Sequence, residues 1–292
     1  MIGKFIAAAQ YFTNRDVPGR SLKVRPDDTF LVSYPRSGNT WTRFLVANFV
    51  HPDAGVTLVS SDRLIPNVDG QSKRYFKEMP GPRIIKSHHP FQPTFKRIIY
   101  VVRDPRDVVL SQYHYQIKRR VLAEDYPIEK FVPLFVAGEV CPYGSWGENV
   151  GTWLVARRFD PQFCLVRYED LLKQTPRELA RIAKMLKIEP TSDRIATAVE
   201  RSTADRMRQL EKVEGSEWSS TKGTRQDISF IRAAKDRQWR TALPKECVLQ
   251  IEKTWGNLMD SLGYSPELAE VTPLAPASFP GMDVRLEATI PV

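Results

Sequence analysis

The chain has 292 residues, of which 42% are hydrophobic and 26% are charged, so it has the size and composition of a globular protein rather than of a disordered chain or a coiled coil. No apolar run reaches the ~20 residues that cross a bilayer, and the three cysteines and four histidines lack the spacing of a disulfide framework or a metal centre. The 43 lysines and arginines exceed the 34 acidic residues to give a net charge of +9, which favours an anionic partner such as a phosphorylated small molecule, a nucleic acid or a membrane surface.

The first part of the chain contains a leader, a strand and a helix. Residues 1–27 are expected to form an N-terminal leader with a helical start, and their apolar patch at 5–9 is too short for a signal-peptide core, so we expect a cytoplasmic protein. Residues 29–34 are an apolar run typical of a buried strand. The spacing of apolar side chains over 40–50 predicts a helix. The first clear unit is therefore strand, tight loop and helix.

The rest of the chain continues the alternation of strands and helices. Strands are predicted over residues 83–88, 97–103 and 163–168, and helices after Asp104-Pro105, over 175–186 and over 249–262. Loop-rich segments are expected over 51–82, a mixture of helix and loop over 121–150, a mobile polar loop over 211–240 and an irregular C-terminal tail over 266–292. The alternation predicts one α/β domain over 28–265, with a central, mostly parallel sheet flanked by helices. Ligands of such sheets bind at the carboxyl ends of the strands.

The loop after the first predicted strand resembles a phosphate-binding loop. Residues 33–40 read SYPRSGNT and stand between a strand and a helix, where backbone N–H groups and the helix N-terminus can meet an anion. Compared with GxxxxGK[ST], Gly38 and Thr40 match, but Asn39 replaces the lysine that holds the outer phosphates of a nucleoside triphosphate. Arg36 supplies a positive charge instead. The alternative is an ordinary strand-to-helix turn.

Two further loops follow predicted strands. In KSHHP, the alternation of side chains along a strand places Lys86 and His88 on one face and His89 on the other. This arrangement suits a general base beside a cation that keeps its imidazole neutral, although one structural histidine and one surface lysine is the alternative. Arg103 ends the next strand, and Ser111 follows it on a helix, so the pair could hold a second phosphate. Pairing of Arg103 with a neighbouring aspartate is the alternative there.

Together these segments resemble the PAPS-dependent sulfotransferases of the cytosolic, small-molecule type, where PAPS is 3′-phosphoadenosine 5′-phosphosulfate. Residues 34–41, YPRSGNTW, look like that family's phosphosulfate loop YPKSGTTW, and KSHHP is similar to its KTHxP. Arg103 and Ser111 have the spacing of its 3′-phosphate motif. Tyr168 matches a tyrosine near the adenine, and Thr203 lies at the contacting position of a segment similar to TSFxxM. The resemblance covers about residues 28–265.

Three departures separate this chain from the family pattern. Arg36 stands where lysine is usual, which keeps the charge but replaces an ammonium by a planar guanidinium. Ala204 replaces the phenylalanine of TSF. Residues 232–239, RAAKDRQW, keep Arg232 and Trp239 of the family's RKGxxGDW but neither glycine nor the lysine.

The resemblance implies a P-loop-like sulfotransferase that transfers a sulfuryl group from PAPS in line to a hydroxyl or an amine of a small molecule, without a metal. It implies three catalytic residues, His88 as base with Lys86 and Arg36, and a donor site made of Arg36, Ser37, Gly38, Asn39, Thr40, Trp41, Arg103, Ser111, Tyr168, Thr203 and Arg232. A nucleic-acid partner is not expected, a homodimer is an open alternative to a monomer, and the identity of the acceptor is not readable. Two other functions are weighed against this one: a P-loop kinase or NTPase, and a non-catalytic binder of anionic glycans or nucleic acid.

Overall fold

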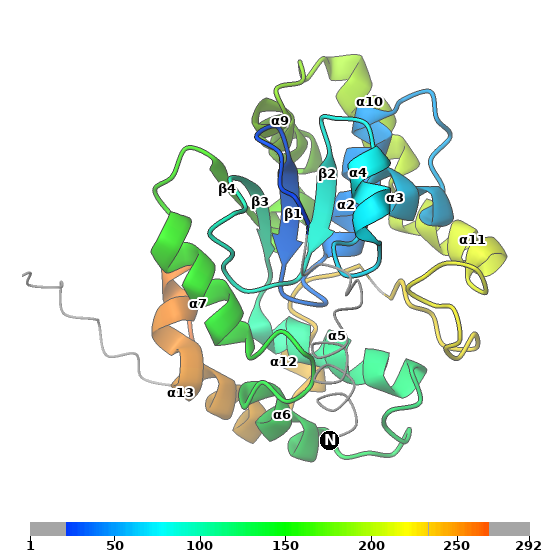
Figure 1. The fold of residues 1–292 in the computed structure, drawn as a ribbon. Coiled ribbons are helices and arrows are strands. Elements are labelled where there is room, and N and C mark those ends of the chain that lie inside the picture. Colours follow the sequence, from blue (N-terminus) through cyan, green and yellow to red (C-terminus); the bar gives the residue numbers. More distant parts are fainter. Residues whose placement is uncertain (1–21, 233, 269–292) are drawn as a thin grey trace, which may run out of the picture.

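The structure is a computed structural model that describes residues 22–232 and 234–268 (Figure 1). Its centre is one parallel sheet of four strands in the order β2-β1-β3-β4. The strands are β1 (Thr29–Ser33), β2 (Ile84–Ser87), β3 (Arg97–Val102) and β4 (Phe163–Arg167). The predicted α/β architecture with a mostly parallel sheet is confirmed, and each of the four strands lies within one residue of its predicted bounds. The predicted leader and tail lie largely outside the described residues.

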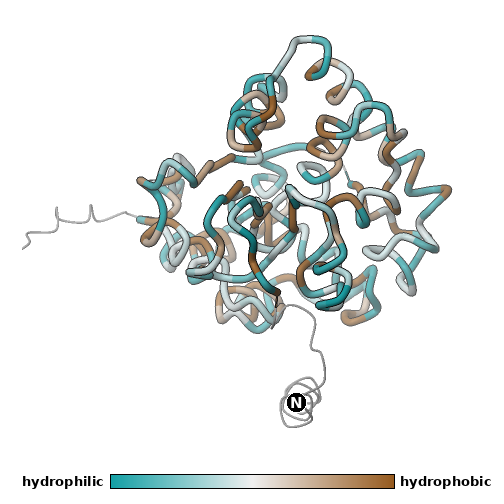
Figure 2. The backbone as a smooth tube through the Cα atoms, turned by 45° about the horizontal axis from the view of Figure 1, so that its top comes forward, coloured by the Kyte–Doolittle hydropathy of each residue, from teal (hydrophilic) through white to brown (hydrophobic). Residues whose placement is uncertain are grey.

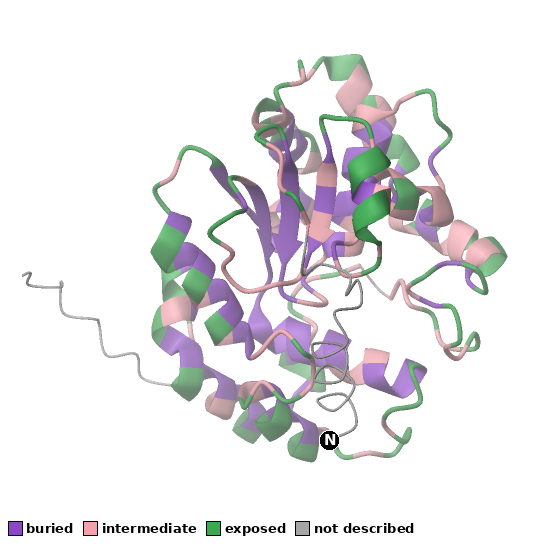
Figure 3. Ribbon diagram, viewed as in Figure 1, coloured by how far each residue is buried: buried purple, intermediate pink, exposed green. Residues whose placement is uncertain are grey.

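Alternate side chains of the central strands enter two separate cores, one on each face of the sheet. On β3, Ile98, Tyr100 and Val102 enter one core, whereas Ile99 and Val101 enter the other. Both faces of an interior parallel strand are covered by helices, which explains why this strand is almost continuously apolar in sequence. Figure 3 shows the central strands β1 and β3 largely buried, and Figure 2 shows the hydrophobic stretches of backbone running through the centre of the molecule.

The helices divide between these two faces (Figure 1). The core that contains Tyr100 is covered by α5 (Pro105–Lys118), α6 (Ile128–Val136), α7 (Trp146–Arg157), α12 (Trp239–Ala242) and α13 (Lys245–Ser261). The core that contains Ile99 is covered by α2 (Asn39–Val50), α3 (Leu58–Leu64), α8 (Tyr168–Lys173), α9 (Thr175–Leu186), α10 (Ser192–Arg201) and α11 (Ala204–Glu214). Among the described helices, none is long and apolar enough to span a membrane.

Two predicted helix starts are confirmed. The Asp104 side chain accepts a hydrogen bond from the Arg106 N–H, and Pro105 follows it in the first turn of α5. The helix predicted over 175–186 matches α9 at both ends. The last helix begins at Lys245, not at residue 249, because Pro244 ends the preceding turn and a helix can begin directly after proline. The apolar spacing that served as the signal starts only later in that helix.

The expected loop segments contain more helix than the sequence predicts. Residues 51–82 contain α3 and α4 (Lys73–Glu78), and the side chains of Thr57 and Ser72 cap them. We also did not predict α8, α10 and α11, which lie between the fourth strand and the polar segment. The loop predicted over 211–240 is shorter, because α11 extends to Glu214 and α12 begins at Trp239. Residues 215–232 and 234–238 are irregular, but this segment packs on the domain: Trp218 is fully buried and contacts Phe230 edge to face.

A buried ion pair joins the amino ends of two strands. Asp28 precedes β1 and Arg83 precedes β2, and the Arg83 guanidinium donates to both carboxylate oxygens of Asp28 at 2.7 and 2.5 Å. Both side chains are buried, and Arg83 also donates to the carbonyl of Lys23 at 3.0 Å. The amino edge of the sheet is therefore closed by a buried arginine that is paired with a carboxylate. At the opposite edge, where the strands have their carboxyl ends, the structure has a pocket.

Candidate active site

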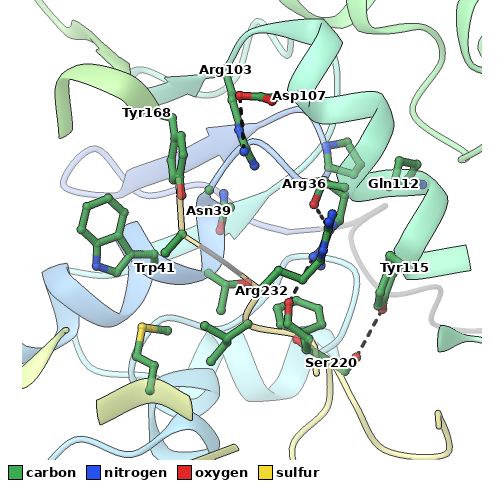
Figure 4. A pocket seen from close by; sticks show the side chains of 18 of the residues that line it. Arg36, Asn39, Trp41, Arg103, Asp107, Gln112, Tyr115, Tyr168, Ser220 and Arg232 are labelled. Carbon is green, nitrogen blue, oxygen red and sulfur yellow. Dashed lines mark hydrogen bonds and ion pairs between the residues drawn. The ribbon is translucent and has the colours of Figure 1, made fainter. Parts of the chain in front are cut away.

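A large pocket lies at the carboxyl edge of the sheet, where the loops after β1, β2 and β3 converge (Figure 4). Its volume of about 640 Å³ is within the roughly 300–1,000 Å³ of small-molecule sites. Among the described residues its lining includes nearly all of the predicted site: Arg36, Gly38, Asn39, Thr40, Trp41, Lys86, His88, Arg103, Ser111, Tyr168, Thr203 and Arg232. Ser37 is the exception, because it is fully buried and does not line the pocket.

The turn after β1 depends on Gly38. This residue is the N-cap of α2 and has φ of 97°, in the left-handed region that favours glycine. A Cβ atom at this position would come within 2.4 Å of the Tyr168 ring. No side chain caps α2, so the first N–H groups of this helix are left for another acceptor at the pocket floor.

Asn39 takes a different orientation from the lysine of a P-loop. Its side-chain amide donates to the Leu31 carbonyl at 3.4 Å and to the Ser33 hydroxyl at 3.1 Å, so it points back toward β1. The side chain ties the loop to the strand, and it presents no cation to the outer phosphates of a nucleoside triphosphate. What Asn39 can offer a ligand is its backbone N–H.

Arg36 supplies the cation of this loop. Its Nε–H donates to the Ser111 hydroxyl at 3.1 Å, and its guanidinium lies close to the rings of Tyr115 and Phe230. Burial, together with the charges of Arg103 and Arg232, lowers the pKa of Arg36 to about 10. A buried guanidinium without a carboxylate partner gains from an anion bound beside it.

His88 and Lys86 share one face at the end of β2, as predicted, and both line the pocket. The Nδ1 atom of His88 lies 2.7 Å from the carbonyl oxygen of Ser33. Since a carbonyl oxygen only accepts, Nδ1 carries the proton and the lone pair of Nε2 is free. Burial and then the Lys86 charge hold the pKa of His88 well below its usual value, while burial lowers the pKa of Lys86 to about 7. The pair is therefore a neutral imidazole beside an easily deprotonated amine.

A hydrogen-bonded group that we did not predict stands next to His88. His89 turns away from the pocket, and its Nε2 lies 2.7 Å from Asp69 Oδ1. The Tyr143 hydroxyl donates to the other oxygen of Asp69 at 2.9 Å, and the Tyr143 ring lies 5.5 Å from the ring of His88. Asp69 and Tyr143 come from loops 74 residues apart, so no local motif could have linked them.

Arg103 is held at the end of β3 by the groups that surround it. Its guanidinium stacks on Tyr168 at 4.4 Å, donates to the Lys235 carbonyl at 3.2 Å and lies 3.7 Å from an Asp107 oxygen. The Nε atom of Arg103 is buried without a partner, so its N–H group is available to donate a hydrogen bond to a ligand. Ser111 also lines the pocket, but its hydroxyl contacts Arg36 and not Arg103.

Three aromatic and apolar side chains surround the part of the pocket next to Arg103. Trp41 lies edge to face with Tyr168 at 5.9 Å, and its indole N–H donates to the Ser202 carbonyl at 2.9 Å. Met207 is buried beside them, and Thr203 caps α11 by accepting from the Arg206 N–H. Flat apolar walls of this kind can hold an aromatic ring.

The segment that departs from the family pattern closes this side of the pocket. Asp107 accepts hydrogen bonds from the backbone N–H groups of Arg237 at 2.8 Å and Trp239 at 3.1 Å. Ala234 and Arg237, which replace the two glycines of RKGxxGDW, have φ of 52° and 56°. The backbone therefore keeps a conformation that suits glycine, although this chain has no glycine there.

The described residues contain no group of three histidine, cysteine, aspartate or glutamate side chains that could hold a metal ion. The arrangement instead combines a free imidazole nitrogen, a lysine and four arginines around one cavity; the arginines are Arg36, Arg103, Arg119 and Arg232. Such a site can bind a ligand that carries several negative charges and can accept a proton next to it.

Comparison with known proteins gives consistent matches. The sequence profile of the sulfotransferase domain matches residues 26–263. Sulfotransferase 1E1 of Rattus norvegicus is 25% identical over 241 residues, which are 77% of this chain and 81% of that protein. The 3-beta-hydroxysteroid sulfotransferase of Cavia porcellus is 27% identical over 267 residues, or 87% of this chain and 90% of that protein.

Two solved structures share the fold. Mouse sulfotransferase SULT7A1 complexed with PAP matches with a TM-score of 0.68 at 24% identity, over 86% of this chain and 91% of that one. Retinol dehydratase, in complex with androsterone and the inactive cofactor PAP, also has a TM-score of 0.68, at 23% identity over 89% and 87% of the two chains.

Proposed function

The chain belongs to the sulfotransferase family and is a sulfotransferase, and we propose that it transfers the sulfuryl group of PAPS to a hydroxyl of a small molecule, with His88 as the general base. The observation that carries this proposal is the free Nε2 of His88 in a pocket that also contains Lys86 and Arg36. A neutral imidazole, a lysine and a guanidinium are what the transfer of an anionic group to a hydroxyl requires.

The described residues fit the donor at both of its phosphate ends. Arg36 and the uncapped N-terminus of α2 would hold the 5′-phosphosulfate, and Arg103, Ser111 and Arg232 would hold the 3′-phosphate. The unpartnered Nε of Arg103 supports this assignment, because a buried donor needs an acceptor. Trp41, Tyr168 and Met207 would contact the adenine.

The chemistry then follows from the atoms that face the pocket. His88 Nε2 removes the hydroxyl proton while the acceptor oxygen attacks sulfur, opposite the oxygen that bridges sulfur and the 5′-phosphate. The new S–O bond forms as that bridging S–O bond breaks, which leaves a sulfate ester, PAP and a protonated His88. Arg36, Lys86 and the N–H groups of α2 stabilise the charge that develops on the bridging oxygen.

The acceptor is proposed to be a small hydroxylated molecule. Androsterone and retinol are molecules of this kind, and structures of retinol dehydratase are described in complex with each of them. In this chain Val140, Pro142 and Tyr143 line the pocket, and the Tyr143 ring lies beside His88. An acceptor screen with labelled PAPS, followed by mass spectrometry for a gain of one sulfate, tests the transfer. Matched hydroxyl and amine compounds in the screen decide which group is used.

Calorimetry separates this function from a kinase or NTPase. PAP carries a 3′-phosphate that ATP lacks, and a charged hydrogen bond contributes about 1.5–3 kcal/mol, so PAP should bind roughly tenfold to a hundredfold more tightly than ATP. Activity should also survive EDTA, because Arg36 and Lys86 provide the positive charge. Tighter binding of ATP, or inhibition by EDTA that Mg²⁺ reverses, would favour the kinase.

A further inference from the structure

Arg36 lies in a corner made by two aromatic rings. Its guanidinium carbon is 4.6 Å from the centre of the Tyr115 ring and 4.2 Å from the centre of the Phe230 ring. The two rings are 5.5 Å apart and nearly perpendicular, at 87°. Figure 4 shows the Arg36 side chain extending toward Tyr115 and Ser220. The corner therefore contacts the guanidinium from two directions.

Each ring is held in place by separate contacts. The Tyr115 hydroxyl donates to the Ser220 carbonyl at 3.3 Å, and Tyr115 lies one helical turn after Ser111 on α5, so both face Arg36. For Phe230, the backbone N–H donates to a carboxylate oxygen of Glu211 at 2.5 Å, and the Trp218 ring packs against its ring at 4.9 Å. Each ring therefore has contacts that hold it in place besides its contact with Arg36.

A guanidinium uses this corner in a way that an ammonium cannot. Of its five N–H donors, Nε–H goes to Ser111 and one Nη2–H points toward the Phe230 carbonyl at 3.5 Å, which leaves three for a ligand. Its planar faces suit contact with aromatic rings, whereas lysine has a compact tetrahedral head. Arg36 also has φ of 68°, a conformation that a non-glycine residue keeps only when its surroundings fix it.

We propose that Tyr115 and Phe230 are positioning residues that hold the Arg36 guanidinium against the 5′-phosphosulfate of the donor. This inference rests on the proposed function, in which Arg36 binds that group. It explains how the chain uses arginine at a position where lysine is usual. It also makes the segment that carries Phe230 a part of the donor site.

A double-mutant cycle on PAP binding tests the proposal without needing an acceptor. A cation–π contact is worth about 0.5–2 kcal/mol, so Tyr115→Leu should weaken PAP binding by about 2- to 30-fold in calorimetry, and Tyr115→Phe, which keeps the ring, by less than about twofold. In an Arg36→Met background, Tyr115→Leu should have no further effect, because the guanidinium is gone. Phe230→Leu should follow the same pattern.

Tyr113→Leu is the matched control. Tyr113 lies on the same helix, but its hydroxyl donates to Tyr126 and its ring packs against Phe131. This variant should lose thermal stability and keep its affinity for PAP. Thermal melting of every variant confirms that it is folded at the temperature of the titration.

The outcomes separate the two proposals. Equal losses from Tyr115→Leu in both backgrounds, or no loss in the wild-type background, overturn the positioning role even when the acceptor screen shows sulfation. Full coupling together with no sulfated product overturns the proposed function and leaves the positioning of Arg36 for a phosphate in place. A wild-type protein that does not bind PAP overturns both.

Discussion

The two ends of the pocket satisfy their polar groups in opposite ways. At the donor end Arg36, Arg103 and Arg232 face one cavity, and Asp107 is the one carboxylate among the described lining residues. Burial, and then repulsion from Arg103, lowers the pKa of Arg232. Around His88, by contrast, the polar side chains bind one another: Asp69 joins His89 to Tyr143, and Asn149 donates to the His88 carbonyl at 2.9 Å. The donor end therefore has an excess of positive charge that a bound anion would balance. The end around His88 instead has a neutral imidazole that can accept a proton.

The largest effect should come from removing the base. Loss of a general base costs about 10²–10⁴-fold in rate, so His88→Ala should lose that much kcat while PAP binds almost as well as to the wild-type protein. His89→Ala is the control, because His89 faces Asp69 and not the pocket; it should lose far less. Near-normal turnover in His88→Ala, with an inactive His89→Ala, would mean that the wrong histidine has been assigned.

The donor end should respond most strongly to the loss of Arg103. Arg103→Ala removes a charged hydrogen-bond donor worth about 1.5–3 kcal/mol, so PAP affinity should fall roughly tenfold to a hundredfold. The KM for the acceptor should change little. Arg97→Ala, at the other end of β3, where the side chain donates to the Asp27 carbonyl, is the control and should leave PAP affinity unchanged. An unchanged Kd in Arg103→Ala would remove this arginine from the site.

The pH profile tests the protonation states of the two groups at the His88 end, His88 and Lys86. Catalysis needs His88 neutral and Lys86 protonated; His88 loses its proton well below pH 6.5, whereas Lys86 loses its own near its pKa of about 7. The kcat/KM should therefore stay flat below neutrality and fall as pH rises past about 7. Lys86→Met removes the charge that helps to lower the pKa of His88, so the acidic limb should move upward, toward pH 6.5. An acidic limb that does not move would mean that Lys86 has no influence on the base.

The smallest effect concerns Ala234 and Arg237, in the segment that closes the donor side of the pocket. A left-handed conformation costs a non-glycine residue about 1–2 kcal/mol, partly offset by the extra freedom of glycine in the unfolded chain. Ala234→Gly and Arg237→Gly should therefore each raise the free energy of unfolding by about 0.5–1 kcal/mol, measured by denaturant titration, and leave PAP affinity almost unchanged. Lys235→Gly is the control, because Lys235 lies between them without a positive φ, and it should not stabilise the protein. If the control stabilises the protein as much, the gain does not come from relief of backbone strain.

The part of the site that could be predicted lies where short motifs meet the ends of strands. The loops at 33–41 and 86–88 and the turn into α5 could be placed because parallel strands bring their carboxyl ends to one edge. Asp69, Tyr143, Tyr115 and Phe230 could not, because they meet through contacts between distant segments that have no local pattern. The same reason applies to residues 211–240, whose polar sequence predicts a loop but not the burial of Trp218 or the role of Phe230 beside Arg36.

The Asp28–Arg83 pair closes the amino edge of the sheet, and all of the proposed chemistry lies at the carboxyl edge. A strand rises roughly 3.3 Å per residue, so the five residues of β1 keep the two edges well apart. The effects of substitutions at sites this far apart on the free energy of unfolding are usually additive. For protein engineering, heat tolerance can therefore be selected at one edge and acceptor preference at the other, in separate libraries that are combined afterwards.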